Sequence, residues 1–321
     1  MMSMSVLMTI AMTMKRKTKM NKQYVYLGAM MFALSFPLET SAQEARISLG
    51  EAEHFNVVVF GDFSAPSSEV EGRMAVGGNL NIRGYSIADE LDDDDNERHY
   101  PYSLVVGGDA TFPTGRVYEG HIVVGGSASG IGSSVRWGLE RGQMLWDHVE
   151  TPFVFNELRE DLTLLSRQLS DLTPNGTIEQ KWGGVYLRGD CISDLQVFHV
   201  PADAILNAHT FDVRCVPEDS HVLINVSGIT AGFDNLSLDD LDDQNEKVLF
   251  NFYQAQTLIL RGVEVEGSVL APLADIGDPE PRGNIEGTLV ANSWSGRMSF
   301  EWEPYEGFND DYRVCEGPVN P

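Results

Sequence analysis

The chain has 321 residues, of which 48 are acidic and 22 are lysine or arginine, so its formal net charge at pH 7 is −26. A surface this acidic repels phosphate backbones and anionic lipid, which argues against nucleic acid or direct membrane binding. The length accommodates one large domain or two small ones.

The first 42 residues have the features of a cleavable signal peptide. A basic stretch over 15–22 precedes an apolar run over 24–36, and Thr40-Ser41-Ala42 resembles the approach to a signal-peptidase site. A membrane anchor is the less favoured alternative, because the apolar run is too short to span a bilayer comfortably. We therefore expect cleavage near Ala42 and a mature chain that is secreted or displayed at a cell surface.

Residues 55–80 contain two short apolar runs, Val57-Val58-Val59-Phe60 and Met74-Ala75-Val76, each closed by glycine. Such runs, bounded by Gly, Pro and Ser, are typical of buried strands joined by tight turns. The second half of this segment recurs along the chain. A Glu-Gly pair followed by an apolar strand occurs at 70–76, 118–124, 265–271 and 285–291, and Val-Gly-Gly corners occur at 76–79, 106–109 and 124–127.

A self-similar unit of one short strand and one glycine corner is the mark of a stacked solenoid. Such a unit cannot bury its own apolar face and must stack on its neighbours. The repeats therefore predict a mainly β fold, a right-handed β-solenoid (β-helix), which forms one domain over residues 43–308.

One segment has helical periodicity instead. Leucine and phenylalanine recur at spacings of three and four from Phe155 to Leu172, and Pro174-Asn175-Gly176 follows. The pattern predicts one α-helix over about 153–173. Because a single leucine stripe needs an apolar surface to lie on, the helix is expected to pack along the side of the solenoid.

Two acidic segments interrupt the strands, at 89–97 and 239–246. Segments so rich in charge cannot bury themselves and are expected to be solvated insertions. Either could bind Ca²⁺, but neither matches the D-x-[DN]-x-[DN]-G loop with a distal Glu, so the solvated loop is favoured. Residues 309–321 are expected to form a polar tail.

Three cysteines follow the expected cleavage site. In an exported protein Cys191 and Cys215 are the natural disulfide pair, since they close a modest loop between neighbouring segments. Cys315 is left over, either as a free thiol or to pair between molecules. The spacing has no metal-ligand signature, so no zinc site is expected.

Several segments, in the same order, resemble the choice-of-anchor A domain family. They are NVVVFGDFSAPSSEVEGRMAVGGN (56–79), SLVVGGDATF (103–112), HIVVGGSAS (121–129), VLINVSG (222–228), VLFNFYQAQTLIL (248–260) and EGSVLAPLADI (266–276). The resemblance covers roughly residues 50–308 and implies an adhesive module of secreted and surface proteins. Many members carry an anchor after this module, whereas no LPxTG sorting motif is found here, which favours plain secretion.

The glutamates of the Glu-Gly repeats are the main candidates for binding residues. They are Glu71, Glu119, Glu266 and Glu286. Alternation along a strand points Val70, Gly72, Met74 and Val76 inward and places the glutamates on the outer face, together with Ser268 and Thr288. If their strands were stacked neighbours, the glutamates would lie about 4.8 Å apart and repel one another. Only the repeats of Glu266 and Glu286 are close enough in the chain for their strands to be expected neighbours. Compensation could come from Arg73 and His121, from a bound cation, or from backbone N–H groups at the glycine corner.

The chain contains no GxSxG, no HExxH and no phosphate-cradling loop, so we expect no enzymatic activity and no cofactor. The favoured function is adhesin-like binding of an extracellular matrix or cell-surface ligand, glycan included, through the outer β faces or loops. One alternative is an ice-binding solenoid, but the outward positions do not form the flat Thr-x-Thr array that this requires. The other is a polysaccharide-cleaving β-helix, which requires a carboxylate cluster in a groove.

Overall fold

Residues 46–91 and 100–309 are described by the computed structural model, and they are mainly β. They lie within one of the two units of the chain, Glu44–Pro321. The expected signal peptide and all but the first residue of the expected tail lie outside the described residues.

Most strands belong to one large sheet whose neighbouring strands are parallel, and these neighbours fall into three series, A, B and C. Series A runs, in spatial order, through β16 (Leu195–Pro201), β18 (His221–Ser227), β20 (Val248–Asn251), β22 (Ser268–Ile276), β24 (Leu289–Ser295), β2 (Val57–Val59), β5 (Met74–Val76), β8 (Tyr102–Val106), β11 (His121–Val124) and β13 (Leu145–Asp147). Series B runs through β19 (Thr230–Asp234), β21 (Thr257–Glu266), β22, β24, β3 (Phe63–Pro66), β6 (Leu80–Arg83), β9 (Ala110–Phe112) and β12 (Gly130–Ile131). Series C runs through β21, β23 (Arg282–Glu286), β25 (Ser299–Glu301), β4 (Glu69–Val70), β7 (Tyr85–Ile87) and β10 (Gly115–Val117).

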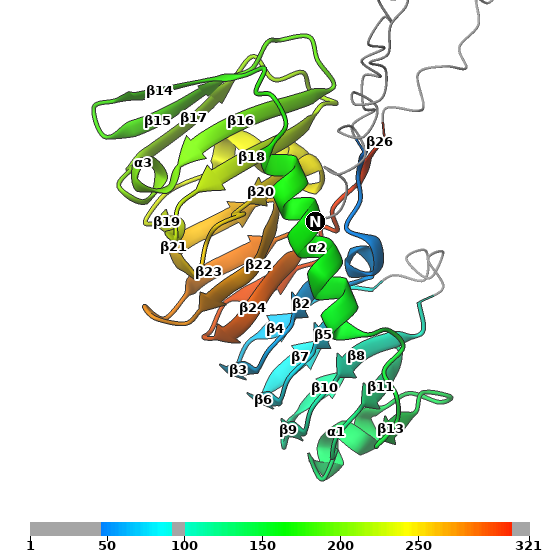
Figure 1. The fold of residues 1–321 in the computed structure, drawn as a ribbon. Helices are drawn as coiled ribbons and strands as arrows, with labels where there is room; N and C mark the ends of the chain where they lie inside the picture. The colour runs from blue at the N-terminus through cyan, green and yellow to red at the C-terminus, as the bar shows by residue number, and fades with distance from the viewer. Residues whose placement is uncertain (1–45, 92–99, 310–321) are drawn as a thin grey trace, which may run out of the picture. The chain divides into compact units, whose positions relative to one another are not determined.

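The chain enters series A in the middle. Val58 of β2 is paired with Ala75 of β5 on one side and with Val290 of β24 on the other. From β2 the chain proceeds to β13 at one end of the series, and helix α2 (Phe155–Ser170) then returns it to the other end. The C-terminal strands run back from β16 to β24 (Figure 1). The sheet is therefore made of two halves, which meet where β2 is paired with β24.

The Val-Gly-Gly corners lie where series A turns into series B. At each corner a backbone N–H donates to a side chain of the preceding corner: that of Asn79 to Oδ1 of Asp62 at 2.7 Å, and that of Asp109 to Oδ1 of Asn79 at 2.9 Å. A Cβ at Gly107 would lie 2.3 Å from the carbonyl oxygen of Gly77, closer than real Cβ atoms approach. Glycine thus makes room for close stacking, and the side-chain oxygen fixes the register of the next corner.

One apolar core lies between the three series, since buried residues from all of them form a single cluster. Val57 of series A, Phe63 of series B and Val70 of series C are all fully buried in it. The inward positions expected at Val70, Met74 and Val76 are therefore correct.

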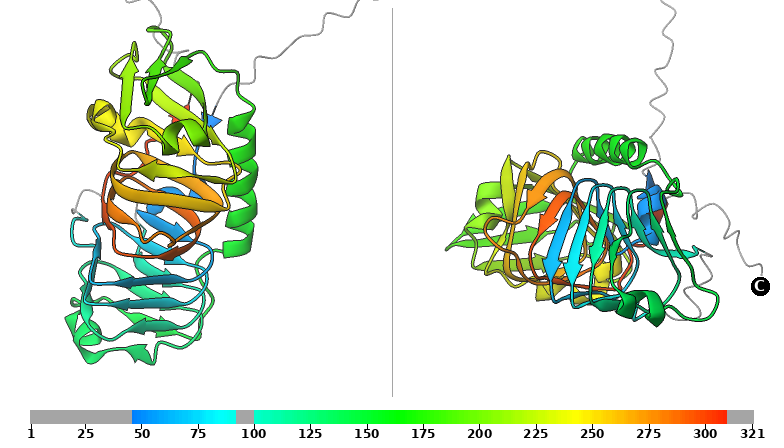
Figure 2. Two further views of the ribbon diagram at one scale, coloured as in Figure 1. Left: turned by 90° about the vertical axis from the view of Figure 1, so that its left-hand side faces the viewer. Right: turned by 90° about the horizontal axis from the view of Figure 1, so that it is seen from below.

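Helix α2 confirms the expected helix and covers the outer side of series A (Figure 2). Its 16 residues make a rod about 24 Å long, which matches five strands spaced about 4.8 Å apart. Leu158, Leu162 and Leu169 are buried against outward residues of the strands below. Those strand residues include Val58, Leu223, Leu249, Leu270 and Val290.

Buried polar groups also fasten α2 to the sheet. The amide of Asn251 donates to the carbonyl oxygen of Ser166 at 2.7 Å, and the amide of Asn225 donates to the carbonyl oxygen of Leu169 at 2.9 Å. Asn251 and Asn225 are hydrogen-bonded to each other as well. Each buried amide therefore has partners, which avoids the cost of an unsatisfied polar group under the helix.

The expectation that Ser268 and Thr288 face solvent is wrong, because both are fully buried. They do lie on the outer side of series A, but segments 47–55 and 305–308 cover that side next to α2. Thr288 Oγ1 donates to the carbonyl oxygen of Phe55 at 3.1 Å. Strand alternation predicted the side of the sheet correctly but not what lies on it.

The remaining elements lie around this framework. They are the short helices α1 (Ser133–Gly138) and α3 (Ala202–Leu206), the 3₁₀ helices η1 (Gly50–His54) and η3 (Asp239–Lys247), the three-stranded sheet of β14 (Thr177–Lys181), β15 (Gly184–Arg188) and β17 (Thr210–Arg214), and the antiparallel pair β1 (Arg46–Ile47) and β26 (Phe308–Asn309). The sequence predicted a single helix because α1 and α3 are too short for a periodic pattern. Among the described residues, no helix is long and apolar enough to cross a membrane.

Cys191 and Cys215 lie next to each other as free thiols. The backbone N–H of Cys191 donates to the carbonyl oxygen of Cys215 at 2.9 Å, and a hydrogen bond to the Cys215 thiol raises the pKa of Cys191. Their adjacency is compatible with the predicted disulfide, which stays a prediction. Cys315 lies outside the described residues.

The packing of α2 on the sheet predicts the effect of placing a charge among the buried leucines of this helix. Leu162 is 3% exposed, whereas Leu164 on the solvent side of the same helix is 56% exposed. Leu162→Asp should lower the free energy of unfolding by more than about 3 kcal/mol, because it removes a packed side chain and buries an unpaired carboxylate. Leu164→Asp should change it by less than about 0.5 kcal/mol. Urea unfolding of both variants measures the difference, and equal stabilities would contradict the packing.

Candidate functional site

Four consecutive strands of series C have a glutamate at the same level, in the strand or directly after it, and we call this set the glutamate column. Its members, in spatial order, are Glu266, Glu286, Glu301 and Glu71. Glu266 is paired with Glu286, and Glu286 with Glu301. Glu71 follows because Val70 is paired with Phe300. The structure thus joins three of the four glutamates predicted from the repeats and adds Glu301, which has no Glu-Gly signature.

Glu119 does not belong to this column. The sequence repeat aligns Tyr118 with Val70, but the structure aligns Val117 with Val70 through Ile87 of the intervening strand. Glu119 therefore lies one residue beyond the level of the column and two strands away from Glu71. A shared Glu-Gly pair was not sufficient to predict the register.

The second acidic segment is not a fully solvated loop as expected. It forms the 3₁₀ helix η3, in which Leu241 is buried in the main core. The carboxylate of Asp240 accepts the backbone N–H of Val213 at 2.9 Å, and the amide of Asn245 donates to Oε2 of Glu286 at 3.2 Å. These contacts hold η3 against the strands and bring Asp242 to the glutamate column.

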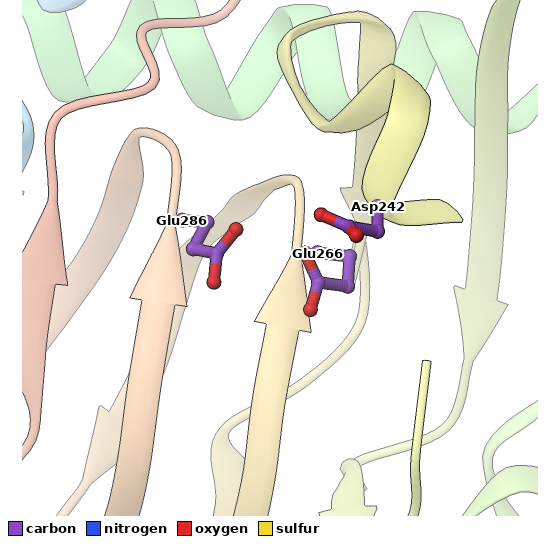
Figure 3. Close-up of side chains that lie close together, drawn as sticks. All are labelled: Asp242, Glu266 and Glu286. Carbon is purple, nitrogen blue, oxygen red and sulfur yellow. The ribbon is translucent and has the colours of Figure 1, made fainter. Parts of the chain in front are cut away.

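Asp242, Glu266 and Glu286 form a compact carboxylate cluster (Figure 3). One carboxylate oxygen from each lies within 4.8 Å of those from the other two. Glu266 is only 5% exposed, and its buried Oε2 has no hydrogen-bond partner among the described residues. Glu286 is half-buried and Asp242 is exposed. Sequence reasoning missed Asp242 because a run of aspartates gives no signal of which one lies beside the glutamates.

Amides and one backbone group provide the hydrogen bonds of the column. The amide of Asn284 donates to Oε1 of Glu301 at 2.7 Å and to Oε1 of Glu286 at 3.2 Å. The backbone N–H of Trp302 donates to Oε2 of Glu71 at 2.9 Å. None of the ion pairs within the described ranges includes a glutamate of the column. In the part of the chain that the structure describes, the hydrogen bonds to the column thus come from neutral donors.

Arg73 and His121 were expected to compensate the glutamates, and the structure gives each of them a further contact. The guanidinium of Arg73 is buried and lies over the ring of Trp302 at 5.8 Å from its centre. Nδ1 of His121 accepts the backbone N–H of Met144 at 3.0 Å. The prediction that backbone N–H groups compensate the glutamates holds for Glu71, but the donor comes from Trp302 rather than from a glycine corner.

The crowding of carboxylates changes their acidity. Burial raises the pKa of Glu266 to about 8, and the carboxyl groups of Glu286, Asp242 and Glu264 add to the shift. Burial is also the main cause of the raised pKa values of Glu71, Glu301 and Glu303. At neutral pH the ionised carboxylates are therefore disfavoured here, and binding of a proton or another cation is favourable.

A second candidate surface is the outer side of series B, where β3, β6 and β9 alternate buried and accessible residues. Small polar side chains lie level with one another on neighbouring strands. They are Ser295, Ser64, Asn81 and Thr111. Arg83 and Pro66 are paired beside them and line a shallow hollow together with Asn81. The arrangement is a regular sheet surface with hydrogen-bonding groups about 4.8 Å apart.

The raised pKa of Glu266 predicts a pH dependence of stability, measured with a chelator present. A carboxyl group whose pKa is higher in the folded than in the unfolded protein favours folding most when it is protonated. Its contribution is fully present below the usual pKa of 4.5 and is lost as the pH rises through about 8. The free energy of unfolding should therefore fall between these values, by at most about 1.4 kcal/mol per pH unit from this one proton.

Glu266→Gln should weaken this fall without abolishing it, because Glu71, Glu301 and Glu303 have raised pKa values too. Denaturant unfolding between pH 5 and pH 9 measures both proteins. Parallel curves for the wild type and the variant would show that Glu266 titrates normally.

Comparison with known proteins gives one result that is relevant to the outer side of series B and to the glutamate column. The family model described as "Putative Ice-binding-like adhesive domain" matches residues 48–302, nearly all of the described region. No curated protein and no solved structure matches the chain. The match identifies an adhesive-domain family but not the choice-of-anchor A family in particular. Because it covers most of the chain, the protein belongs to the family of ice-binding-like adhesive domains.

Proposed function

We propose that the protein is a non-enzymatic adhesin that binds a glycan at a cell surface or in an extracellular matrix through the outer side of series B. The observation that carries the proposal is the row of Ser64, Asn81 and Thr111, which no described element covers. The outer side of series A, in contrast, lies under α2 and the segments beside it. Membership of an adhesive-domain family supports the same conclusion.

The chemistry of the surface favours an uncharged, hydroxyl-rich ligand. Hydroxyl and amide groups both donate and accept hydrogen bonds, as sugar hydroxyls do. The strongly negative net charge disfavours acidic polysaccharides. The hydrogen bonds between successive corners hold the strands in register, so the binding groups are pre-organised and lose little entropy when a ligand binds.

We further propose that series A, B and C are the three sides of a right-handed β-solenoid. From β2 to β12 the chain visits the series in the unchanging order A, B, C, which supports a coil. Right-handedness is the usual sense of connections between parallel strands. An experimental structure with open or left-handed coils would overturn this part of the proposal.

Ice is a second candidate ligand, favoured by the description of the family and by the regular spacing of series B. Ice-binding faces need a flat repeated array, and Thr111 is the only threonine in the row of Ser295, Ser64, Asn81 and Thr111. The row therefore supports glycan binding better than ice binding. The choice-of-anchor A resemblance implies the same adhesive role.

A polysaccharide-cleaving enzyme is the remaining alternative, because the carboxylate cluster meets one of its requirements. Glu266, however, is too deeply buried to reach a substrate. The hollow beside the column is lined by Glu264, Arg282 and Gly283 and by none of the three clustered carboxylates. Release of reducing ends from a bound glycan would overturn the non-enzymatic proposal.

A glycan and matrix-protein array tests the binding proposal with the mature chain and three variants. Asn81→Tyr and Thr111→Tyr place a bulky ring on the exposed surface of series B and should weaken glycan binding at least tenfold. Asn156→Tyr makes the same kind of change at an exposed position of α2 and should leave binding unchanged. Unaltered binding in the series B variants would contradict the assignment of the surface. Thermal hysteresis without glycan binding would favour the ice-binding alternative.

We also propose that the chain is exported, cleaved near Ala42 and oxidised at Cys191 and Cys215. The adjacency of the two thiols supports the last step, because a disulfide needs its cysteines side by side. Peptide mapping without reductant should detect the Cys191–Cys215 link in protein recovered from the culture medium, and an N-terminus close to Gln43. A link from Cys215 to Cys315, or retention of the leader, would contradict the proposal.

A further inference from the structure

The carboxylate cluster of Asp242, Glu266 and Glu286 combines side chains from two strands of the sheet and from one 3₁₀ helix. Glu266 and Glu286 are neighbours on β21 and β23, whereas Asp242 comes from η3. Figure 3 shows the three carboxyl groups close together in the space between the strands and the helix. Asp242 and Asp243 are both exposed on η3, but only Asp242 has a carboxylate oxygen within 4.8 Å of those of Glu266 and Glu286.

The most deeply buried member of the cluster, Glu266, lacks a hydrogen-bond donor for one carboxylate oxygen. Glu266 is 5% exposed, and no amide, hydroxyl or backbone N–H of the described residues donates to Oε2 of its carboxylate; only the carboxyl group of Glu286 could share a proton with it. Burial of an unpartnered carboxylate oxygen is unfavourable, more so beside two other carboxylates. Asn245 and Asn284 donate to Glu286 but not to Glu266.

We propose that Asp242, Glu266 and Glu286 bind one divalent cation of the calcium class. Three carboxylates are hard oxygen ligands. They suit Ca²⁺ or Mg²⁺ better than metals that prefer thiolate or imidazole ligands. Oxygen atoms up to 4.8 Å apart fit opposite sides of a Ca²⁺ ion, whose ligands lie about 2.3–2.6 Å from the metal. Mg²⁺, with ligands at about 2.0–2.1 Å, requires a tighter arrangement. Bidentate coordination and water would complete the six to eight oxygens that Ca²⁺ takes.

The cation would fasten η3 to the sheet. It would give Oε2 of Glu266 a partner and would replace repulsion between two elements by attraction to a shared charge. Calcium should therefore stabilise the protein and protect residues 239–247 more than the rest of the chain.

Isothermal titration with CaCl₂ and thermal unfolding with and without a chelator, at pH 7.5 and 150 mM NaCl, test the proposal. The mature chain should bind one Ca²⁺ ion more tightly than any others, unfold at a higher temperature with calcium, and exchange the amides of residues 239–247 more slowly. Glu266→Gln and Asp242→Asn should weaken this binding at least tenfold. The matched controls Glu264→Gln, on the same strand, and Asp243→Asn, on the same helix, should change it less than threefold.

Two results would overturn the proposal. One is calcium binding that Glu266→Gln and Asp242→Asn leave unchanged, which would mean diffuse attraction of cations to an acidic protein. The other is a wild type that has no tight site, with Glu266→Gln more stable in the chelator, which would mean that a shared proton relieves Glu266. Thermal unfolding in the chelator also verifies that both variants fold.

Discussion

The close approach of successive backbones at the corners is the constraint on which the rest of the structure depends. A Cβ at Gly107 would collide with the carbonyl oxygen of Gly77, and one at Gly125 would collide with that of Gly107. The corners can therefore stack at the spacing of a β-sheet only with glycine at these positions. The hydrogen bonds to Asp62 and Asn79 then remove any freedom of register. Regular stacking aligns both the apolar core and the exposed row of series B.

The same regularity aligns like charges. In series C it places Glu266, Glu286, Glu301 and Glu71 at one level, so that these side chains lie beside one another on neighbouring strands. Parallel pairing repeats whatever the sequence puts at a given position, so a favourable ladder of valines and an unfavourable ladder of glutamates have one cause. The protein offsets part of the repulsion with the amide of Asn284 and the backbone of Trp302. Glu266 is left with a buried oxygen that these donors do not reach.

The sequence predicted those features that depend on neighbouring residues in the chain. Alternation identified the inward Val70, Met74 and Val76, and the leucine spacing identified α2 to within a few residues. Glu266 and Glu286 were expected to be neighbours because their repeats lie close together in the chain.

The features that escaped prediction depend on which distant segments meet. Nothing near Ser268 or Thr288 signals that segments 47–55 and 305–308 cover them. Glu301 lacks the glycine that marks the repeats, and Glu119 has it but lies outside the register. Asp242 is one of several aspartates, and it lies beside the glutamates because η3 packs on the core through Leu241.

The position of β2 in the middle of series A has a consequence for how the protein folds. Residues 57–59 leave the ribosome long before residues 289–291, with which they are paired. Until then one edge of β2 has free N–H and C=O groups, and such an edge readily pairs with strands of other chains. Pairing between strands so far apart in the chain is also slow, because the entropy cost of closing the long loop comes before the favourable contacts form. Strand β2 is thus among the first to be synthesised but among the last to be paired on both sides. Until β24 has formed, the N-terminal half has to avoid aggregation through this unpaired edge.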